Sequence, residues 1–185
     1  VEFAIQAGGE LKKYNEAVDL WKRVLQLEPG FTKAFLNMGY AYLKLKKYEE
    51  ARAASKRTME LDPGLKEASI VYTTCEILLG DPGSTIPILE ELLKKTPEYP
   101  MAVAILAAAY GMGDKKEKGL EHIKYLMKMG FECANYLRDM SDRLVSVGKM
   151  DRAILLLEFA VESGNGTREI RELLDGLMIG DSMIG

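Results

Sequence analysis

The side chains that could perform catalysis or bind a metal are few in this sequence and lie far apart. His122 is the single histidine of the 185-residue chain, and no serine or cysteine motif surrounds it. A catalytic triad needs a nucleophile, a base and a group that orients the base, so His122 alone indicates a histidine on a helix surface or at an interface. One histidine and two cysteines also argue against a multi-ligand zinc site. We therefore predict no catalytic residues, no metal and no cofactor.

The two cysteines, Cys75 and Cys133, are 58 positions apart and fall in different copies of the repeat described below. Because stacked helix pairs lie about 10 Å apart, two copies separate the Cα atoms beyond the reach of a disulfide. Free thiols are typical of a reducing compartment. The first residues also lack the basic stretch followed by an apolar stretch that marks a secretory signal. These observations predict a cytoplasmic location.

Glycines and paired carboxylates give no further sign of an active site. Neither Gly8-Gly9 nor Gly111-x-Gly113 is followed by the Lys-Ser/Thr pair of a phosphate-binding loop. Glu49-Glu50 and Glu90-Glu91 are neighbours on one helix and point in different directions, as solvated side chains do. The sequence therefore predicts a protein that is not an enzyme.

Composition excludes several other classes of protein. Hydrophobic residues make up 48% of the chain and charged residues 29%, which is sufficient for a core and a soluble surface. The net charge of −3 is too balanced to indicate binding to nucleic acid or to an anionic membrane. No apolar run approaches the length of about 18 residues that spans a bilayer, so we expect no membrane insertion.

The dominant pattern of the chain is a repeat of 34 residues. Pro29, Pro63 and Pro97 are separated by this step. Five copies keep the spacing without an insertion, and the clearest column consists of small residues: Ala17, Ala51, Thr85, Gly119 and Ala153. A regular period of this length is typical of repeat architectures, in which each copy is one supersecondary unit.

Each copy has the pattern of two helices joined by a short turn. In the second copy, apolar residues recur at steps of three and four from Leu36 to Leu45 and again from Ala51 to Leu61. Lys46-Lys47 interrupts the two runs, and Pro63-Gly64 ends the copy because proline cannot continue a helix and glycine accepts a left-handed conformation. The sequence thus predicts a series of helical hairpins.

The second copy resembles a tetratricopeptide repeat. Phe35-x2-Met38-Gly39-x2-Tyr42 is similar to the first helix of that motif, and Tyr48, Ala51-x3-Ser55 and Pro63 are similar to the rest of it. The resemblance implies an all-α, right-handed α-solenoid superhelix of about five hairpins. We expect one domain over 1–178, built from repeats at approximately 1–31, 32–65, 66–99, 100–133 and 134–164. A capping helix at 167–178, with Thr167 as its N-cap, and a flexible tail at 179–185 should follow.

The third copy departs from this pattern at two positions. Pro87 falls near the start of its second helix, so we predict that this helix begins late, with Ser84 or Thr85 as the N-cap. Glu76 stands where the second and fourth copies have Tyr42 and Tyr110. A carboxylate between hairpins costs several kcal/mol unless it is paired or turned to solvent, so irregular packing is expected there.

The resemblance also implies a binding surface, because the first helices of tetratricopeptide repeats line a concave groove that receives segments of partner proteins. In the register of this sequence, the predicted groove positions are Lys33, Leu36, Asn37, Tyr40, Lys44, Glu67, Ile70, Val71, Thr74, Met101, Ala104, Ile105, Arg138 and Asp142. The middle of this set is apolar and suits a helix face or an extended segment with hydrophobic anchors.

The predicted function is therefore that of a non-catalytic interaction module that binds a peptide or helical segment of an unidentified protein. Two alternatives remain open at this point. The chain could be a self-assembling scaffold, in which a second copy fills the apolar surface, or it could be the regulatory repeat array of a larger multidomain protein. Helical repeats that read RNA have basic walls, which these positions lack, so nucleic acid is not an expected partner.

Overall fold

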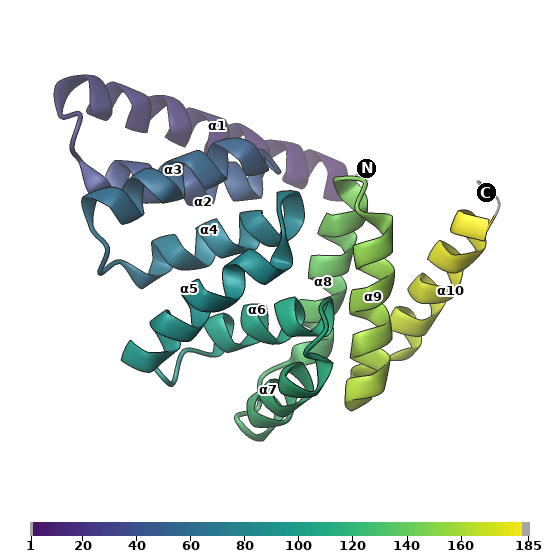
Figure 1. Cartoon of the computed structure of the whole chain (residues 1–185). Helices are drawn as coiled ribbons and strands as arrows, with labels where there is room; N and C mark the ends of the chain where they lie inside the picture. The colour runs from purple at the N-terminus through teal and green to yellow at the C-terminus, as the bar shows by residue number, and fades with distance from the viewer. Residues whose placement is uncertain (1, 183–185) are drawn as a thin grey trace. The chain divides into compact units, whose positions relative to one another are not determined.

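The computed structural model describes residues 2–182, with side chains from Glu10 to Ile179. Within that range all regular structure is helical, which confirms the all-α prediction (Figure 1). The helices have these bounds: α1 Glu2–Leu27, α2 Thr32–Lys44, α3 Tyr48–Leu61, α4 Lys66–Leu79, α5 Pro82–Lys95, α6 Pro100–Gly111, α7 Lys116–Lys128, α8 Cys133–Ser146, α9 Met150–Ala160 and α10 Arg168–Ser182, with a π-helical turn at Val161–Asn165 between the last two.

The chain divides into two compact units, residues 1–79 and residues 80–185. The division falls at the turn between α4 and α5, in the middle of the predicted third repeat. Each unit has helices that pack on one another in chain order, α1 to α4 in the first and α5 to α10 in the second. A single domain over 1–178 stays a prediction.

The first repeat differs from the expected hairpin. One continuous helix, α1, runs through Lys12 and Lys13, where the other copies turn. Lys12-Lys13 corresponds to Lys46-Lys47, which forms the turn of the second copy, so the residue types at this point do not distinguish a turn from a continuous helix. In the second and fifth copies the turn depends on backbone with positive φ, at Lys46 (57°) and Gly148 (73°). The prediction of a turn in the first copy was therefore wrong.

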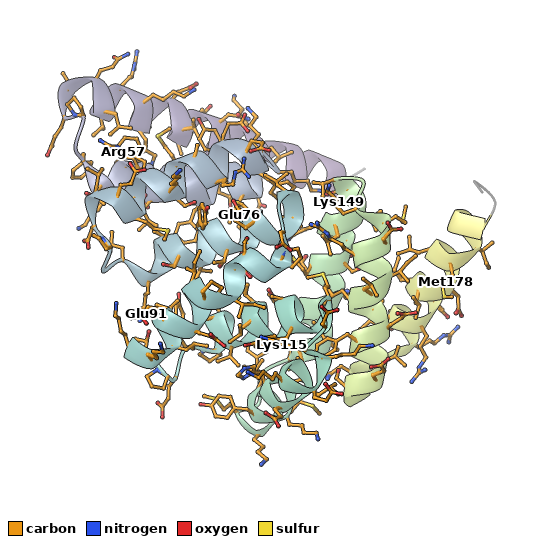
Figure 2. The ribbon with its side chains drawn as sticks, viewed as in Figure 1. Arg57, Glu76, Glu91, Lys115, Lys149 and Met178 are labelled. Atoms are coloured by element: carbon orange, nitrogen blue, oxygen red, sulfur yellow. The ribbon has the colours of Figure 1, made fainter. Side chains whose placement is uncertain are left out.

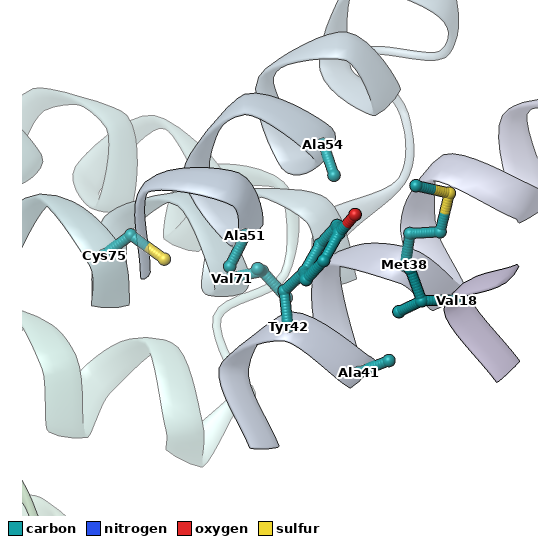
Figure 3. Packing of buried hydrophobic residues seen from close by; sticks show 8 residues of the cluster. All are labelled: Val18, Met38, Ala41, Tyr42, Ala51, Ala54, Val71 and Cys75. Atoms are coloured by element: carbon teal, nitrogen blue, oxygen red, sulfur yellow. The ribbon is translucent and has the colours of Figure 1, made fainter. Parts of the chain in front are cut away.

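The core of the first unit lies between α1, α2, α3 and α4. It contains Val18, Met38, Ala41, Tyr42, Ala51, Ala54, Val71 and Cys75 (Figure 3). At Gly39 on α2, an added Cβ would lie 3.4 Å from Val71 Cγ1 and 3.7 Å from the carbonyl oxygen of Ala51, which is ordinary van der Waals contact.

Buried hydroxyl groups in this unit are paired with the backbone of their own helices. Ser55 Oγ donates to the Ala51 carbonyl at 2.9 Å, and Thr58 Oγ1 donates to the Ala54 carbonyl at 3.0 Å. A hydroxyl buried without a partner would cost about 1–3 kcal/mol. These hydrogen bonds allow Ser55 and Thr58 to be buried without an unsatisfied hydroxyl group.

The second unit begins with α5, whose start differs from the prediction. Asp81 is the N-cap and accepts a hydrogen bond from the Gly83 N–H at 3.0 Å, and Pro82 occupies the first helical position. Aspartate and proline are both favoured at these positions. Pro87 consequently lies inside the helix, so the prediction of a late start at Ser84 or Thr85 was wrong.

The core of the second unit is built around α6, which is buried from Ala102 to Gly111. The ring of Phe159 on α9 lies against the backbone of α6 and α7 at two glycines. A Cβ added to Gly111 would come within 2.5 Å of the Phe159 ring, and one added to Gly119 within 2.9 Å of the Ala107 carbonyl oxygen. A helix that is apolar on all sides is expected to be buried, as α6 is.

The C-terminal helix agrees in part with the predicted cap. The Ile170 N–H donates to Thr167 Oγ1 at 3.3 Å, so Thr167 caps the helix as predicted. Ile170 is buried against the rest of the unit. The helix continues to Ser182, so the prediction of a flexible tail was wrong for residues 179–182. Residues 183–185 lie outside the described part of the chain.

Candidate functional site

The predicted groove residues separate into exposed and buried groups. Exposed or half-exposed are Lys33, Leu36, Asn37, Tyr40 and Lys44 on α2, Glu67 on α4, Met101 on α6, and Arg138 and Asp142 on α8. The exposed fractions of Tyr40 and Met101 are 39% and 38%. A side chain must reach solvent before it can contact a partner, so only this group remains available for binding.

Three predicted groove residues belong to the core instead. Val71 packs with its Cγ1 atom against Gly39, and its side chain is fully buried. Ala104 and Ile105 are buried to 1% and 0% exposure within the second unit. The prediction was wrong for these residues because α6 has an apolar side chain on every side, and α4 turns Val71 toward α2. Ile70 and Thr74 are also buried, with 8% exposure each, so the prediction that they line an open groove was wrong for them too.

The most complete exposed surface is the outer face of α2. Lys33, Asn37, Tyr40 and Lys44 follow one another at steps of four, three and four residues, which places them on one side of the helix. At a rise of 1.5 Å per residue, the two lysines are about 16 Å apart along the helix axis. We refer to these four residues as the α2 face. It presents two cations, an amide and an aromatic ring in a row.

The opposite side of α2 fixes this face in position. Ala34, Met38 and Tyr42 are buried there, with Met38 and Tyr42 in the core shared with α1 and α3. Phe31, directly before the helix, packs its ring 6.5 Å from that of Trp21 on α1. The α2 face therefore belongs to a helix that is held on two sides, and ligand binding would not need to order it.

A second feature of the first unit is an ion-pair network that the sequence only partly indicated. Arg52 on α3 contacts Glu76 on α4 at 3.4 Å and Glu49 at 2.6 Å. These residues line a hollow of about 410 Å³ together with Tyr72. Burial, and then the neighbouring Glu76, raise the pKa of the Tyr72 hydroxyl. Glu76 is thus paired, the condition under which a carboxylate is tolerated at this position.

Tyr110 forms a comparable polar cluster in the second unit. Its hydroxyl donates to Glu90 Oε1 at 2.5 Å, and its ring stacks on His122 with the centroids 5.9 Å apart. Lys118 Nζ lies 5.7 Å from the centroid of the same ring. Burial raises the pKa of Tyr110 to about 12, and it lowers the pKa of His122. His122 is half-buried against an aromatic ring, so of the two predicted positions, on a helix surface or at an interface, the structure has the second.

The second unit also has a cavity of about 410 Å³ at the turns that precede α5 and α7. Ile86 and Leu155 provide apolar lining, while Asp81, Lys115 and Arg152 provide charges of both signs. Figure 2 shows Lys115 at the turn between α6 and α7. Arg152 donates to the Gly80 carbonyl oxygen, so its guanidinium group already serves to hold this turn.

Two searches of the described residues bear on other functions. Among residues 2–182, no three histidine, cysteine or carboxylate side chains come together as a metal site would require. The helices in the described part of the chain are also too short or too polar to cross a membrane. Cys75 and Cys133 are buried free thiols, as predicted.

Sequence comparison identifies the repeat independently. The family model described as "Tetratricopeptide repeat" matches residues 10–69, which include the second copy and the Gly39 and Tyr42 positions. No curated protein sequence matches the chain. Tetratricopeptide repeats generally mediate protein–protein interactions.

Solved structures show the same fold over nearly the whole chain. MamA from Desulfovibrio magneticus is 19% identical, with 90% of this chain and 95% of that chain covered and a TM-score of 0.62. TTC0263, a thermophilic tetratricopeptide repeat protein of Thermus thermophilus, is 17% identical, with 97% of each chain covered and a TM-score of 0.57.

A third structure, YrrB, is described as a tetratricopeptide repeat protein with an unusual peptide-binding site. It is 13% identical, with 92% of this chain and 87% of that chain covered and a TM-score of 0.62. At these identities the likeness shows the fold. It confirms the resemblance and the expected solenoid class.

Proposed function

We propose that this chain, which has a tetratricopeptide repeat sequence and fold, is a non-catalytic interaction module that binds a peptide segment of a partner protein. The observation that carries the proposal is the α2 face. Lys33, Asn37, Tyr40 and Lys44 lie in one row on a helix whose other side is fixed in the core. A preformed surface of this kind spares much of the entropy that ordering a binding site costs.

The chemistry of the α2 face favours a particular type of peptide. The Asn37 amide can both donate to a carbonyl group and accept from an N–H group, as a peptide backbone in extended conformation requires. The exposed ring of Tyr40 offers an apolar surface beside it, and aromatic residues are enriched among the anchors of interfaces. Lys33 and Lys44 at the two ends favour acidic residues on either side of an apolar anchor, and they would set the direction and register of the peptide.

Other exposed positions extend the proposal without carrying it. Glu67 on α4 is half-exposed and lies in the same unit as the α2 face. Met101, Arg138 and Asp142 lie in the second unit, where they are exposed. We propose these three as partner contacts of the second unit by itself.

The test compares two tyrosines of similar exposure. Peptides are selected from a displayed random library on the immobilised chain, and their Kd values are then measured for the wild type, Tyr40→Glu and Tyr125→Glu. We expect Tyr40→Glu to weaken binding by about tenfold or more, which corresponds to about 1.4 kcal/mol. Tyr125 on α7 is 41% exposed against 39% for Tyr40, so it controls for the loss of an exposed ring and the gain of a charge.

The melting temperature of both variants should remain that of the wild type, because substitutions at exposed positions usually change stability by less than about 0.5 kcal/mol. Selected peptides that bind Tyr40→Glu as tightly as the wild type would contradict the proposal. A large loss of stability in Tyr40→Glu would show instead that Tyr40 is a packing residue.

A further inference from the structure

The outer face of α1 is apolar and exposed. Helix α1 packs on α2 with Val18, Trp21 and Leu25. On its other side, Leu20 is 60% exposed and Leu27 is 89% exposed, with half-buried Val24 between them. Steps of four and three residues place Leu20, Val24 and Leu27 in one stripe, which we call the α1 stripe.

The 34-residue register shows what normally covers this stripe. The equivalents of Leu20 and Val24 are Ala54, Ile88, His122, Leu156, Thr58, Leu92, Leu126 and Ala160. Five of these eight are 0–7% exposed and the other three are half-buried, and Ala54 belongs to the core that α3 shares with α2. The equivalents of Leu27 are half-buried or exposed, so Leu20 and Val24 carry the comparison. In the other repeats, the surface equivalent to the α1 stripe lies on the second helix and packs against the first helix of the same repeat. In the first repeat, within the described residues 2–182, no separate first helix packs there, because α1 continues straight toward its N-terminus.

Helix α10 has the complementary arrangement at the other end of the register. Met178 corresponds to Leu144, Tyr110 and Tyr42, which are 0%, 2% and 8% exposed, and to the half-buried Glu76, while Met178 is 49% exposed (Figure 2). Leu174 corresponds to Met140 and Leu106 and is half-buried. By register, α10 is the first helix of a repeat, docked on the preceding α9, and Met178 is an exposed apolar residue in a column that is largely buried in the earlier repeats.

We propose that α10 of one molecule docks on the α1 stripe of a second molecule, so that two copies of this chain complete one repeat between them. The contact would continue an interface that the chain already forms internally, with the same columns that pair α8 with α9. It goes beyond the proposed function, because the α2 face takes no part in it.

The charges at the two helix ends suit this arrangement. Paired helices of a repeat run in opposite directions, so the first turn of α10 meets the last turn of α1. Arg168 and Arg171 lie in the first turn of α10 together with Glu169. Arg168 is paired with Glu172 at 2.7 Å, and Arg171 Nε donates to the Gly166 carbonyl oxygen at 3.0 Å. The last turn of α1 has no basic residue, and Glu28 follows it. Basic side chains near the C-terminus of a helix interact favourably with its dipole.

The contact is heterologous, since a different surface of each molecule takes part, and it can therefore extend into chains or close into rings. One helix pair buries less surface than a standard stable interface, so association should be weak and should increase with concentration.

Light scattering after size-exclusion chromatography, over a wide range of concentrations, tests the proposal on the 185-residue chain. The wild type should exceed its monomer mass of 20.6 kDa as concentration rises. Leu20→Glu and Met178→Glu should each remain monomeric, because each removes one side of the contact. Met129→Glu is the matched control, since Met129 is 45% exposed and lies on neither surface, and it should associate like the wild type.

A mixture of the two broken variants distinguishes this arrangement from a symmetric one. Leu20→Glu retains an intact α10 and Met178→Glu retains an intact α1 stripe, so the mixture should form a species of twice the monomer mass and nothing larger. A symmetric contact through α1 would leave Met178→Glu associated, and one through α10 would leave Leu20→Glu associated. Either result, a wild type that stays monomeric, or a mixture that stays monomeric overturns the proposal.

Discussion

Helices α2 and α6 occupy the same place in the repeat, one in each unit, yet only α2 leaves a face in solvent. The sequence of α2 has Lys33, Asn37 and Lys44 among its apolar residues, whereas α6 reads Pro-Met-Ala-Val-Ala-Ile-Leu-Ala-Ala-Ala-Tyr-Gly without a charged side chain. A helix of the first kind buries one stripe, and a helix of the second kind is covered on all sides. The same repeat position thus serves as a surface in one unit and as core in the other.

The two helices also differ in how much room their glycines leave. At Gly39 in α2, an added Cβ would make ordinary contact with Val71 Cγ1 at 3.4 Å. At Gly111 in α6, it would lie 2.5 Å from the ring of Phe159. Helix α6 and the Phe159 ring are therefore packed too closely for a side chain at position 111, as expected for a helix in a core.

The largest expected effect is the difference between truncations on the two helices. Ile105→Ala should lower the free energy of unfolding of the second unit by about 2–5 kcal/mol, because it leaves a cavity at a fully buried site. Leu36→Ala on the half-buried side of α2 should cost less than half of that. Chemical denaturation followed by circular dichroism measures both. Equal losses would show that the two helices are equally buried, against the comparison drawn above.

The glycines should give the next largest difference. Gly111→Ala should lower the free energy of unfolding by about 1–3 kcal/mol, since overpacking displaces the Phe159 ring. Gly39→Ala should be neutral or stabilising by up to about 1 kcal/mol, because alanine is the better helix former and the space exists. Thermal melting of the two variants is the measurement. The double variant Gly111→Ala with Phe159→Leu should recover part of the loss if the ring is the cause.

The smallest effect concerns pH and the His122 side chain. Burial lowers the pKa of His122 in the folded chain below its ordinary value of 6.5. At pH values between the lowered pKa and 6.5, the folded state therefore binds fewer protons than the unfolded state. Stability from this group is therefore complete above pH 6.5 and is lost as the pH falls through the folded pKa.

The urea midpoint of the wild type at pH 5.5 and 7.5, compared with that of His122→Gln, isolates this contribution. His122 is the single histidine of the chain, so no other imidazole titrates in this range. We expect the wild type to lose stability relative to the variant at the lower pH. The opposite sign would mean that the neighbouring Glu90 and Glu121 outweigh burial.

The sequence predicted the helices well wherever the repeat spacing and a turn residue agreed. The ends of α2, α3, α8 and α9 follow from columns of small and apolar residues and from Gly148 or Pro63. The start of α5 was missed because two capping solutions existed, and the Asp81–Gly83 hydrogen bond decided between them. The straight course of α1 was missed because Lys12-Lys13 repeats the Lys46-Lys47 pair that forms the turn of the second copy, so the sequence gives no sign of a continuous helix there.

The binding surface was harder to predict than the fold, because register gives the position of a residue along a helix and not the degree of its burial. Val71 and Ile105 occupy register positions like those on α2, but their helices are covered differently. For Ile105 a signal was present in the sequence, since no polar residue separates the apolar faces of α6. For the ion pair between Arg52 and Glu76, the sequence indicated only that a carboxylate at position 76 is unusual, and it did not indicate Arg52 as the partner.

Each unit contains one cysteine, and both thiols are enclosed, with exposed fractions of 0% for Cys75 and 2% for Cys133. A thiol reagent can reach either sulfur only when the surrounding helices separate, so the rate of labelling reports how often that unit opens. Burial also raises the pKa of Cys133, which makes the closed form still less reactive. The native chain thus has an intrinsic probe for the opening of each unit, and Cys75→Ala or Cys133→Ala would assign the two rates.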